Sequence, residues 1–379
     1  MRITISIWFC LMVVLLGEET PQVSLGKRIF LDTSLSNPPG QACVSCHSPQ
    51  NAFADPRRVS PGAMEGQKGR RNAPSLMYAA LIPPQRLEDT YDENGDLEYI
   101  VEGGLFLDGR AHDLLEQVRH PFFDKNEMNI ADGKELARKL RTKDYGEVFK
   151  GLDDKEVNER AFRALVAFLR EPMFRPFNAR IDEYWAGNKD ALTLSEKRGL
   201  DVFQTSGGCA TCHLTGVSSW PEPLLTDAGF DNLGVPAIGT KDPGLGAITG
   251  KAGELGQFKV PSLRNVALTA PYLHNGSIKS LKEVMEFYNK RDLEPERWGV
   301  TNYPETVNHE DMGDLGLTEQ EVEDLVALMD AFTDRNLLEM KAGQQFPTVP
   351  PGVPSTKERK AFFLPKRRHD LTTPRRPGQ

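Results

Sequence analysis

The sequence predicts a mainly α fold built from two similar units in tandem, with long loops and little strand. Three observations lead to this prediction. The chain has 379 residues, more than a single domain core usually serves. The stretch LGKRIFLDTSLSNPPGQACVSCH near residue 25 is echoed by EKRGLDVFQTSGGCATCH near residue 196. Apolar residues elsewhere recur at helical spacing, whereas alternating strand patterns are weak throughout.

Individual helices are expected where an apolar stripe or a capping signature stands out. Thr318 with Glu321, and Ser280 with Glu283, have the spacing of a capping box before an apolar run. Between the helices lie long loops rich in Pro and Gly, such as 214–262, which usually need a cofactor or metal to organise them. A helix over 155–171 is predicted from the stripe Val157, Phe162, Leu165, Val166 and Leu169.

The N-terminus has the pattern of an export signal. Arg2 precedes an uncharged apolar run over 3–16, which is shorter than the roughly 20 residues of a membrane span. We expect residues 1–17 to be a signal peptide or, because the cleavage site is poor, an uncleaved anchor. Either form indicates an exported protein of a bacterial periplasm, an oxidising compartment. No later stretch is long and apolar enough to span a bilayer.

The remaining chain divides into two units and a tail. We expect an N-terminal unit over 18–185 and a C-terminal unit over 186–345, each with one Cys-x-x-Cys-His motif. Residues 346–379 are first Pro-rich and then basic, which predicts a partly disordered tail. Its alternative role is a docking arm for an acidic partner or a membrane surface. The net charge of -8 gives no indication of nucleic acid binding.

Four of the five cysteines belong to two copies of one pentapeptide. A Cys-x-x-Cys pair can be a redox dithiol, half of a zinc site or a disulfide, but a following His is typical of c-type haem attachment. The spacer puts both sulfurs at one edge of the macrocycle, and the His reaches the iron. Two covalent haems are therefore predicted, with His47 and His213 as iron ligands. The attachment cysteines are Cys43, Cys46, Cys209 and Cys212.

Haem attachment alone leaves electron carriage and catalysis open. A carrier has both axial positions of the iron filled, whereas a catalyst keeps one position open beneath polar groups. Several separate stretches bear on this choice: RRNAPSL (70–76), LFLDGRAHDLLEQ (105–117), NEM (126–128), VPSLRNVALTAPYLHNG (260–276) and SLKEVMEFYN (280–289). With these stretches and both motifs, the chain resembles the bacterial di-haem cytochrome c peroxidase family, which includes the MauG-type enzymes, from about Leu25 to Phe332.

The resemblance implies two cytochrome c-like domains, each around one covalent haem. The first haem would be the peroxidatic one, with His47 as proximal ligand and with Gln117 and Glu127 on its open face. A carboxylate there can move a proton between the peroxide oxygens, and an amide can orient the peroxide.

The second haem, on His213, would be the electron entry site. The resemblance implies Tyr288 as its far ligand, with Met285 one turn earlier as the alternative. A phenolate lowers the iron potential and a thioether raises it. His274 resembles the family's neighbouring His near this haem. Calcium between the domains is implied at Asn72, Thr269 and Pro271.

The sequence departs from the family pattern at two positions. Leu107 stands where the family has a Trp between the haems, and an aliphatic side chain cannot relay a hole as an indole can. Met64 stands where reductively activated members have a His that caps the first haem, so that haem is expected to be permanently five-coordinate, or weakly bound by Met64. The segment 77–104 is longer than usual for the family.

The leading functional hypothesis is a periplasmic peroxidase that reduces hydrogen peroxide with electrons from a cytochrome c or a cupredoxin. The alternatives are a MauG-like enzyme that oxidises Trp or Tyr of a partner protein, and a non-catalytic di-haem electron carrier. Tyr288 favours the MauG-like alternative and Leu107 disfavours it. A homodimer is the alternative to a monomer.

Overall fold

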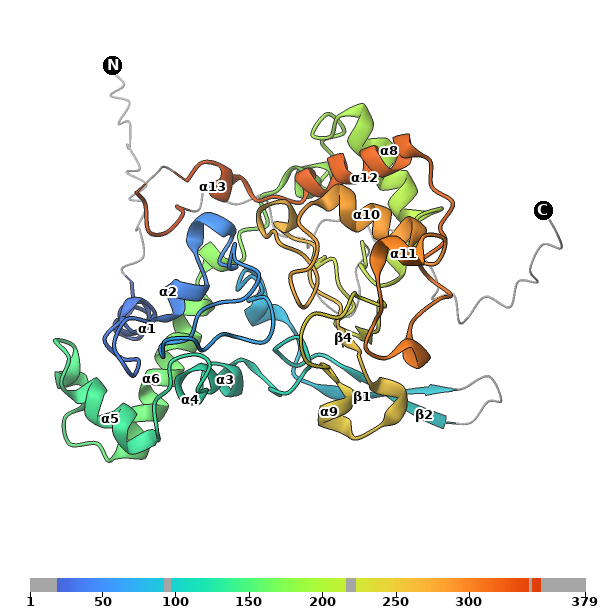
Figure 1. Ribbon diagram of the computed structural model, residues 1–379. Coiled ribbons are helices and arrows are strands. Elements are labelled where there is room, and N and C mark those ends of the chain that lie inside the picture. The colour runs from blue at the N-terminus through green and yellow to red at the C-terminus, as the bar shows by residue number, and fades with distance from the viewer. Residues whose placement is uncertain (1–18, 92–96, 216–222, 341–342, 349–379) are drawn as a thin grey trace, which may run out of the picture.

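The computed structural model describes residues 19–91, 97–215, 223–340 and 343–348. These residues form a mainly helical molecule with two small sheets (Figure 1). Among them, no helix has the length and apolar character needed to cross a bilayer. The predicted signal or anchor over 1–17 and most of the predicted tail lie outside the described residues.

The helices and strands are spread along the whole described chain. The α-helices are α1 (Pro21–Leu31), α2 (Cys43–Cys46), α3 (Leu114–Gln117), α4 (His120–Phe123), α5 (Gly133–Arg141), α6 (Asp154–Leu169), α7 (Arg180–Trp185), α8 (Leu194–Gln204), α9 (Gly246–Thr249), α10 (Leu281–Lys290), α11 (Pro295–Trp298), α12 (Glu319–Ala331) and α13 (Arg335–Leu338). The strands are β1 (Arg86–Tyr91), β2 (Leu97–Glu102), β3 (Phe230–Asp231) and β4 (Phe258–Lys259). Short 3-10 turns lie at Pro49–Asn51, Ala79–Leu81, Gly146–Phe149, Pro172–Phe174, Cys209–Thr211, Ala252–Glu254, Val266–Leu268 and Pro304–Thr306.

Two helix pairs pack in the same way, with a glycine of one helix against the backbone of the other. α1 crosses α6 at Gly26, where an added Cβ would lie 2.0 Å from the carbonyl oxygen of Ala164. α8 crosses α12 at Gly199, where an added Cβ would lie 2.1 Å from the carbonyl oxygen of Asp324. In both pairs only a glycine allows the backbones to approach so closely. The two pairs lie apart in Figure 1, and each contains one copy of the stretch that the sequence repeats.

The buried apolar side chains form separate clusters around these pairs. The main cluster gathers residues of α1, α5 and α6, and a second cluster gathers residues of α7, α8 and α12. A smaller third cluster includes Phe287 of α10 and Trp298 of α11. The division of the chain at residue 185 stays a prediction.

The structure confirms the helices expected from sequence. The predicted stripe of 155–171 is buried along α6. Thr318 and Glu321 form a reciprocal capping box at the start of α12, and the Ser280 hydroxyl accepts from the Glu283 N–H at the start of α10.

The segment 77–104 contains the larger of the two sheets. β1 and β2 pair antiparallel, with Arg86 opposite Glu102 and Tyr91 opposite Leu97. The hairpin projects from the body of the molecule (Figure 1).

The start of the predicted tail packs against the main apolar cluster. The Phe346 ring stacks on Phe53 with ring centroids 6.2 Å apart and an interplanar angle of 16°. This contact extends the main apolar cluster beyond the end of α13.

Candidate functional site

The first Cys-x-x-Cys-His motif folds as a single tight turn. Cys43 and Cys46 begin and end α2, so their side chains lie one turn apart. The His47 N–H continues the turn by donating to the Cys43 carbonyl at 2.9 Å. The Ser48 N–H then donates to the Ala54 carbonyl at 3.1 Å, and the Ser48 carbonyl accepts from the Phe53 N–H at 2.8 Å, which closes the loop after His47.

The orientation of the His47 ring is fixed by one hydrogen bond. Its Nδ1 lies 3.0 Å from the Phe53 carbonyl oxygen. A carbonyl can only accept, so Nδ1 carries the proton and Nε2 keeps its lone pair. Burial lowers the pKa of His47, which keeps the ring neutral. A neutral imidazole whose other nitrogen donates to a carbonyl is the usual form of a metal-binding histidine.

The second motif repeats this arrangement. The His213 N–H donates to the Cys209 carbonyl at 2.9 Å, and the His213 Nδ1 lies 2.9 Å from the Leu225 carbonyl oxygen. Burial lowers the pKa of His213 to about 4. Phe53 and Leu225, which supply the two carbonyls, both have positive φ, at 58° and 56°. Backbone strain of this kind persists where the surroundings impose it, and here it aims a carbonyl at a ring nitrogen.

The cysteines fit thioether attachment better than the alternatives left open by sequence. Cys43, Cys46 and Cys209 form no disulfide. Burial raises the pKa of Cys43 and of Cys209 to about 12, so neither is an activated thiolate. A shared zinc site would need the sulfurs to converge, and within the described ranges no three His, Cys, Asp or Glu side chains are grouped to hold a metal. Two thiols with an adjacent neutral imidazole, twice, are the donor set of two c-type haems.

A cavity of about 460 Å³, here called the first cavity, opens beside His47. Gln117, at the end of α3, and Glu127, in the turn after α4, both line it together with Cys46. The structure therefore brings together the residues that the sequence assigned to the first haem. Met64, in contrast, is 43% exposed and is not among the residues that line this cavity.

Glu127 is a half-buried acid in this cavity. Burial raises the pKa of Glu127 to about 7; the neighbouring Asp124 raises it further, and Arg110 opposes the shift. Its backbone is fixed, since the carbonyl accepts from the Ala63 N–H at 2.7 Å. A carboxyl that is half protonated near neutral pH can both accept and donate a proton.

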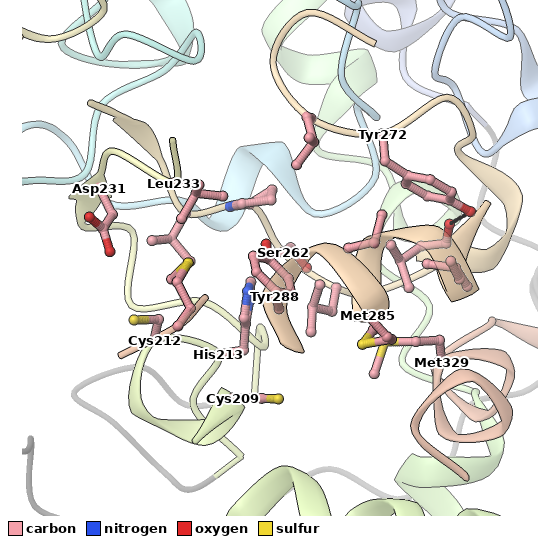
Figure 2. A pocket seen from close by; sticks show the side chains of 18 of the residues that line it. Cys209, Cys212, His213, Asp231, Leu233, Ser262, Tyr272, Met285, Tyr288 and Met329 are labelled. Carbon is pink, nitrogen blue, oxygen red and sulfur yellow. Dashed lines mark hydrogen bonds between the residues drawn. The ribbon is translucent and has the colours of Figure 1, made fainter. Parts of the chain in front are cut away.

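A second cavity, of about 250 Å³, contains His213 and the attachment cysteines Cys209 and Cys212. Tyr288 and Met285 reach it from α10, and Figure 2 shows Tyr288 beside His213, with Met285 next to Met329 at the edge. Burial raises the pKa of Tyr288, and the sulfurs of both attachment cysteines lie close enough to add to the effect.

Met285 has a packing role that Tyr288 does not share. Met285 belongs to the apolar cluster of α8 and α12, whereas Tyr288 lies at the edge of the third cluster. This division leaves the phenol as the polar group of α10 that faces the cavity.

The remaining residues assigned to the second haem line the same cavity. His274 stacks on Phe258 with ring centroids 3.7 Å apart, and burial lowers its pKa to about 4. Asn72, Thr269 and Pro271, where calcium was expected, also line this cavity. The Asn72 Nδ2 donates to the Arg57 carbonyl at 2.9 Å, so the side-chain oxygen of Asn72 is not the atom that faces Arg57.

One wall separates the two cavities. The residues that line both are Asn72, Pro74, Ser75, Leu107, Lys259, Val260, Pro261, Ser262 and Arg264. None of them is aromatic. The Leu107 carbonyl accepts from the Lys259 N–H at 2.7 Å, which joins the two segments that form the wall.

Several residues at this wall carried no signal in the sequence analysis. Lys259 is partly buried and donates to the Gly104 carbonyl at 2.8 Å, and loss of solvent around its ammonium group lowers its pKa to about 8. Arg264 pairs with Asp182 at 2.8 Å, with both side chains fully buried. A charged residue within an apolar stretch, such as the Arg of VPSLRNVAL, is the signal that could have indicated a buried pair, but nothing in the sequence names its partner.

The chain is similar to several known proteins. The family described as di-haem cytochrome c peroxidase matches residues 20–190. Methylamine utilization protein MauG of Paracoccus denitrificans is 34% identical over 365 residues, covering 85% of this chain and 92% of that protein. Cytochrome c551 peroxidase of Nitrosomonas europaea is 30% identical over 286 residues, covering 74% of this chain and 76% of that protein. The crystal structure of the diheme peroxidase BthA from Burkholderia thailandensis superposes with a TM-score of 0.75 at 33% identity, covering 88% of this chain and 91% of that one.

Proposed function

The chain belongs to the di-haem cytochrome c peroxidase family, and from this membership we propose that it reduces hydrogen peroxide to water with electrons from a small redox protein. Members of the family are di-haem peroxidases, so the chain is a haem-dependent oxidoreductase. The observation that supports peroxide reduction is that Glu127, with its raised pKa, and Gln117 line the same cavity as His47.

In this proposal the residues of the first cavity handle protons and position peroxide. When bound, the haem would supply the iron and the electrons needed to cleave the O–O bond. The Glu127 carboxylate accepts the proton of one peroxide oxygen and donates it to the other peroxide oxygen, which then leaves as water. Gln117 orients the peroxide through its amide, and the Phe53 carbonyl holds His47 in the tautomer that leaves Nε2 for the iron.

The second cavity is the proposed entry point for electrons, with Tyr288 as the far ligand of its iron. Support comes from the position of Tyr288 in the cavity of His213 and from the commitment of Met285 to the core. Binding to iron would remove the phenolic proton, since metal ligands bind in their deprotonated form.

The assay that tests the function mixes holoprotein with hydrogen peroxide and reduced cytochrome c or cupredoxin. We expect continuous peroxide-dependent oxidation of the donor. A plain electron carrier would be reoxidised by peroxide only slowly and without turnover, and this result would reject the proposal.

The MauG-like alternative is supported by the 34% identity with MauG and by Tyr288 in the second cavity. Leu107 in the shared wall weighs against it. Incubation with peroxide and a candidate partner protein, followed by mass spectrometry of the partner's Trp and Tyr residues, separates the two activities.

The rate should depend on pH through Glu127. Because its pKa is raised to about 7 and the base form accepts the proton from peroxide, we expect kcat/KM to rise with pH and to level off above about 7. The substitution Asp124→Asn removes a negative charge that raises this pKa, so the inflection should move to lower pH. A pH profile of kcat/KM for both proteins measures the shift. Superimposable profiles would contradict the role of Glu127 as the titrating base.

The ligand assignment predicts a spectroscopic change. In the oxidised protein, Tyr288→Phe should convert the second haem from low-spin to high-spin, because the phenol oxygen is removed while the ring remains. Electron paramagnetic resonance measures the change. Met285→Leu is the matched control on the same helix and should leave the spectrum unaltered. The reverse outcome would assign the iron to Met285.

Three further features belong to the proposal. Export to a periplasm is expected from residues 1–17, which lie outside the described part of the chain. Calcium at Asn72, Thr269 and Pro271 is supported by the cavity that the three residues share and by the oxygen donors that they carry. Homodimer formation is the open oligomeric alternative, which light scattering of the holoprotein decides.

A further inference from the structure

Tyr78 is an oxidisable side chain at the edge of the first cavity. It lines this cavity together with His47 and is only 1% exposed. Its hydroxyl donates to the Asp334 carboxylate, with oxygen–oxygen distances of 2.9 Å to Oδ1 and 2.8 Å to Oδ2, and accepts from the Phe177 N–H at 3.0 Å. The residue therefore borders the cavity, and its hydroxyl proton is directed at a buried carboxylate.

Asp334 is held in place as that base. It is 0% exposed, and it also accepts from the Asn178 N–H at 3.2 Å and from the Asn265 Nδ2 at 2.8 Å. Burial raises the pKa of Asp334 to about 6, which makes it a stronger proton acceptor than an ordinary carboxylate. Burial, together with Asp334, raises the pKa of Tyr78 well above its usual value, so the phenol keeps its proton.

The wall between the cavities has no oxidisable aromatic side chain among its shared residues, whereas Tyr78 lies next to it. Its shared lining residues include no Tyr or Trp. Tyr78 lies directly beside the wall, because the guanidinium of Arg264, which lines both cavities, is 5.0 Å from the centre of the Tyr78 ring. Among the residues that line the first cavity, Tyr78 is the aromatic side chain with an ionisable hydroxyl.

We propose that Tyr78 is a redox-active residue. It gives one electron toward the reduction of hydrogen peroxide in the first cavity, while its phenolic proton passes to Asp334. This inference rests on the proposed peroxidase function, which supplies the oxidant.

The step balances in atoms and charge. Hydrogen peroxide takes up two electrons, together with two protons from solvent, to give two waters. One electron leaves the Tyr78 ring, its O–H bond breaks, and an O–H bond forms on Asp334; the products are a neutral tyrosyl radical and a protonated carboxyl. The second electron comes from the donor protein by way of the second cavity. A later electron from the same source reduces the radical, and the proton returns from Asp334 to the phenol oxygen.

Tyr145 provides a matched control. It too is buried, its hydroxyl donates to Asp32 Oδ2 at 2.6 Å, and the guanidinium of Arg28 lies 4.8 Å from its ring centre. It belongs to the same apolar cluster as Tyr78 but is not among the residues that line the first or second cavity. The two sites therefore share their hydrogen-bond chemistry and differ in access to the cavities.

The experiment freezes holoprotein within milliseconds of mixing with hydrogen peroxide and records electron paramagnetic resonance spectra. We expect a radical signal in the wild-type protein whose hyperfine pattern changes when the protein contains ring-deuterated tyrosine. Tyr78→Phe should abolish that signal and Tyr145→Phe should retain it. Asp334→Asn should slow radical formation by roughly 10²-fold, because the phenol loses its proton acceptor.

Peroxide consumption, measured in the same samples, separates this inference from the proposed function. A wild-type protein that consumes peroxide without a tyrosyl signal, or a Tyr78→Phe protein with an unchanged signal, overturns the role of Tyr78 and leaves peroxidase activity standing. A wild-type protein that does not consume peroxide rejects both. If Tyr78→Phe fails to fold, the deuterium effect together with Asp334→Asn decides the question.

Discussion

Substitution of Glu127 by glutamine is expected to lower kcat for peroxide reduction by about 10²- to 10⁴-fold, the usual cost of losing a positioned general base. The amide has nearly the same size and keeps an acceptor oxygen, so the cavity that Glu127 shares with His47 and Gln117 should keep its shape. Glutamine cannot take the proton from bound peroxide. The measurement is steady-state turnover with a saturating electron donor.

The matched control is Glu65→Gln. Glu65 is exposed in the loop whose Ala63 N–H donates to the Glu127 carbonyl, so it is near the site but outside the first cavity. The control should retain full activity. Haem absorbance of both variants should match the wild-type protein. A Glu127→Gln protein with wild-type turnover would mean that solvent, rather than this carboxyl, moves the proton.

Arg264→Met should destabilise the folded protein by about 3–5 kcal/mol, the cost of removing one partner of a buried ion pair. The guanidinium donates to both oxygens of Asp182, at 3.0 and 2.8 Å, and to the Pro223 carbonyl at 2.8 Å. Without it, the fully buried Asp182 carboxylate loses both charge-assisted hydrogen bonds from the guanidinium. Urea unfolding of the holoprotein, followed by circular dichroism, measures the loss.

Two comparisons make this prediction specific. Lys150→Met removes an exposed pair with Glu147, whose side chains are 81% and 86% exposed, and should cost about 0–1 kcal/mol. The double variant Arg264→Met, Asp182→Asn should be more stable than Arg264→Met alone, because the amide at position 182 removes the buried negative charge that the lost guanidinium had balanced. A loss below about 1 kcal/mol for the single variant would show that water reaches Asp182.

The sequence predicts the local features of this protein well. A Cys-x-x-Cys-His turn is a local structure, and both copies form the tight turn that the spacing implies. Capping at Ser280 and Thr318 and the stripe of α6 depend on neighbours within a few residues, and they are found as expected.

The contacts that complete the site are not local, and the sequence did not reveal them. Tyr78 and Asp334 are 256 residues apart, and Arg264 and Asp182 are 82 apart. The carbonyls that fix His47 and His213 come from backbone atoms, which leave no mark on residue identity. Gln117 and Glu127 were assigned by resemblance, and only folding shows that they share a cavity with His47.

The single partition between the two cavities also constrains how such a protein can change over evolution. A substitution at Lys259 or Ser262 alters the surroundings of both metal centres at once, since each residue borders both compartments. Selection that adjusts one centre alone must therefore act on residues that border only that centre, such as Glu127 on one side and Tyr288 on the other. A substitution in the wall therefore affects both sites, because each wall residue borders both cavities.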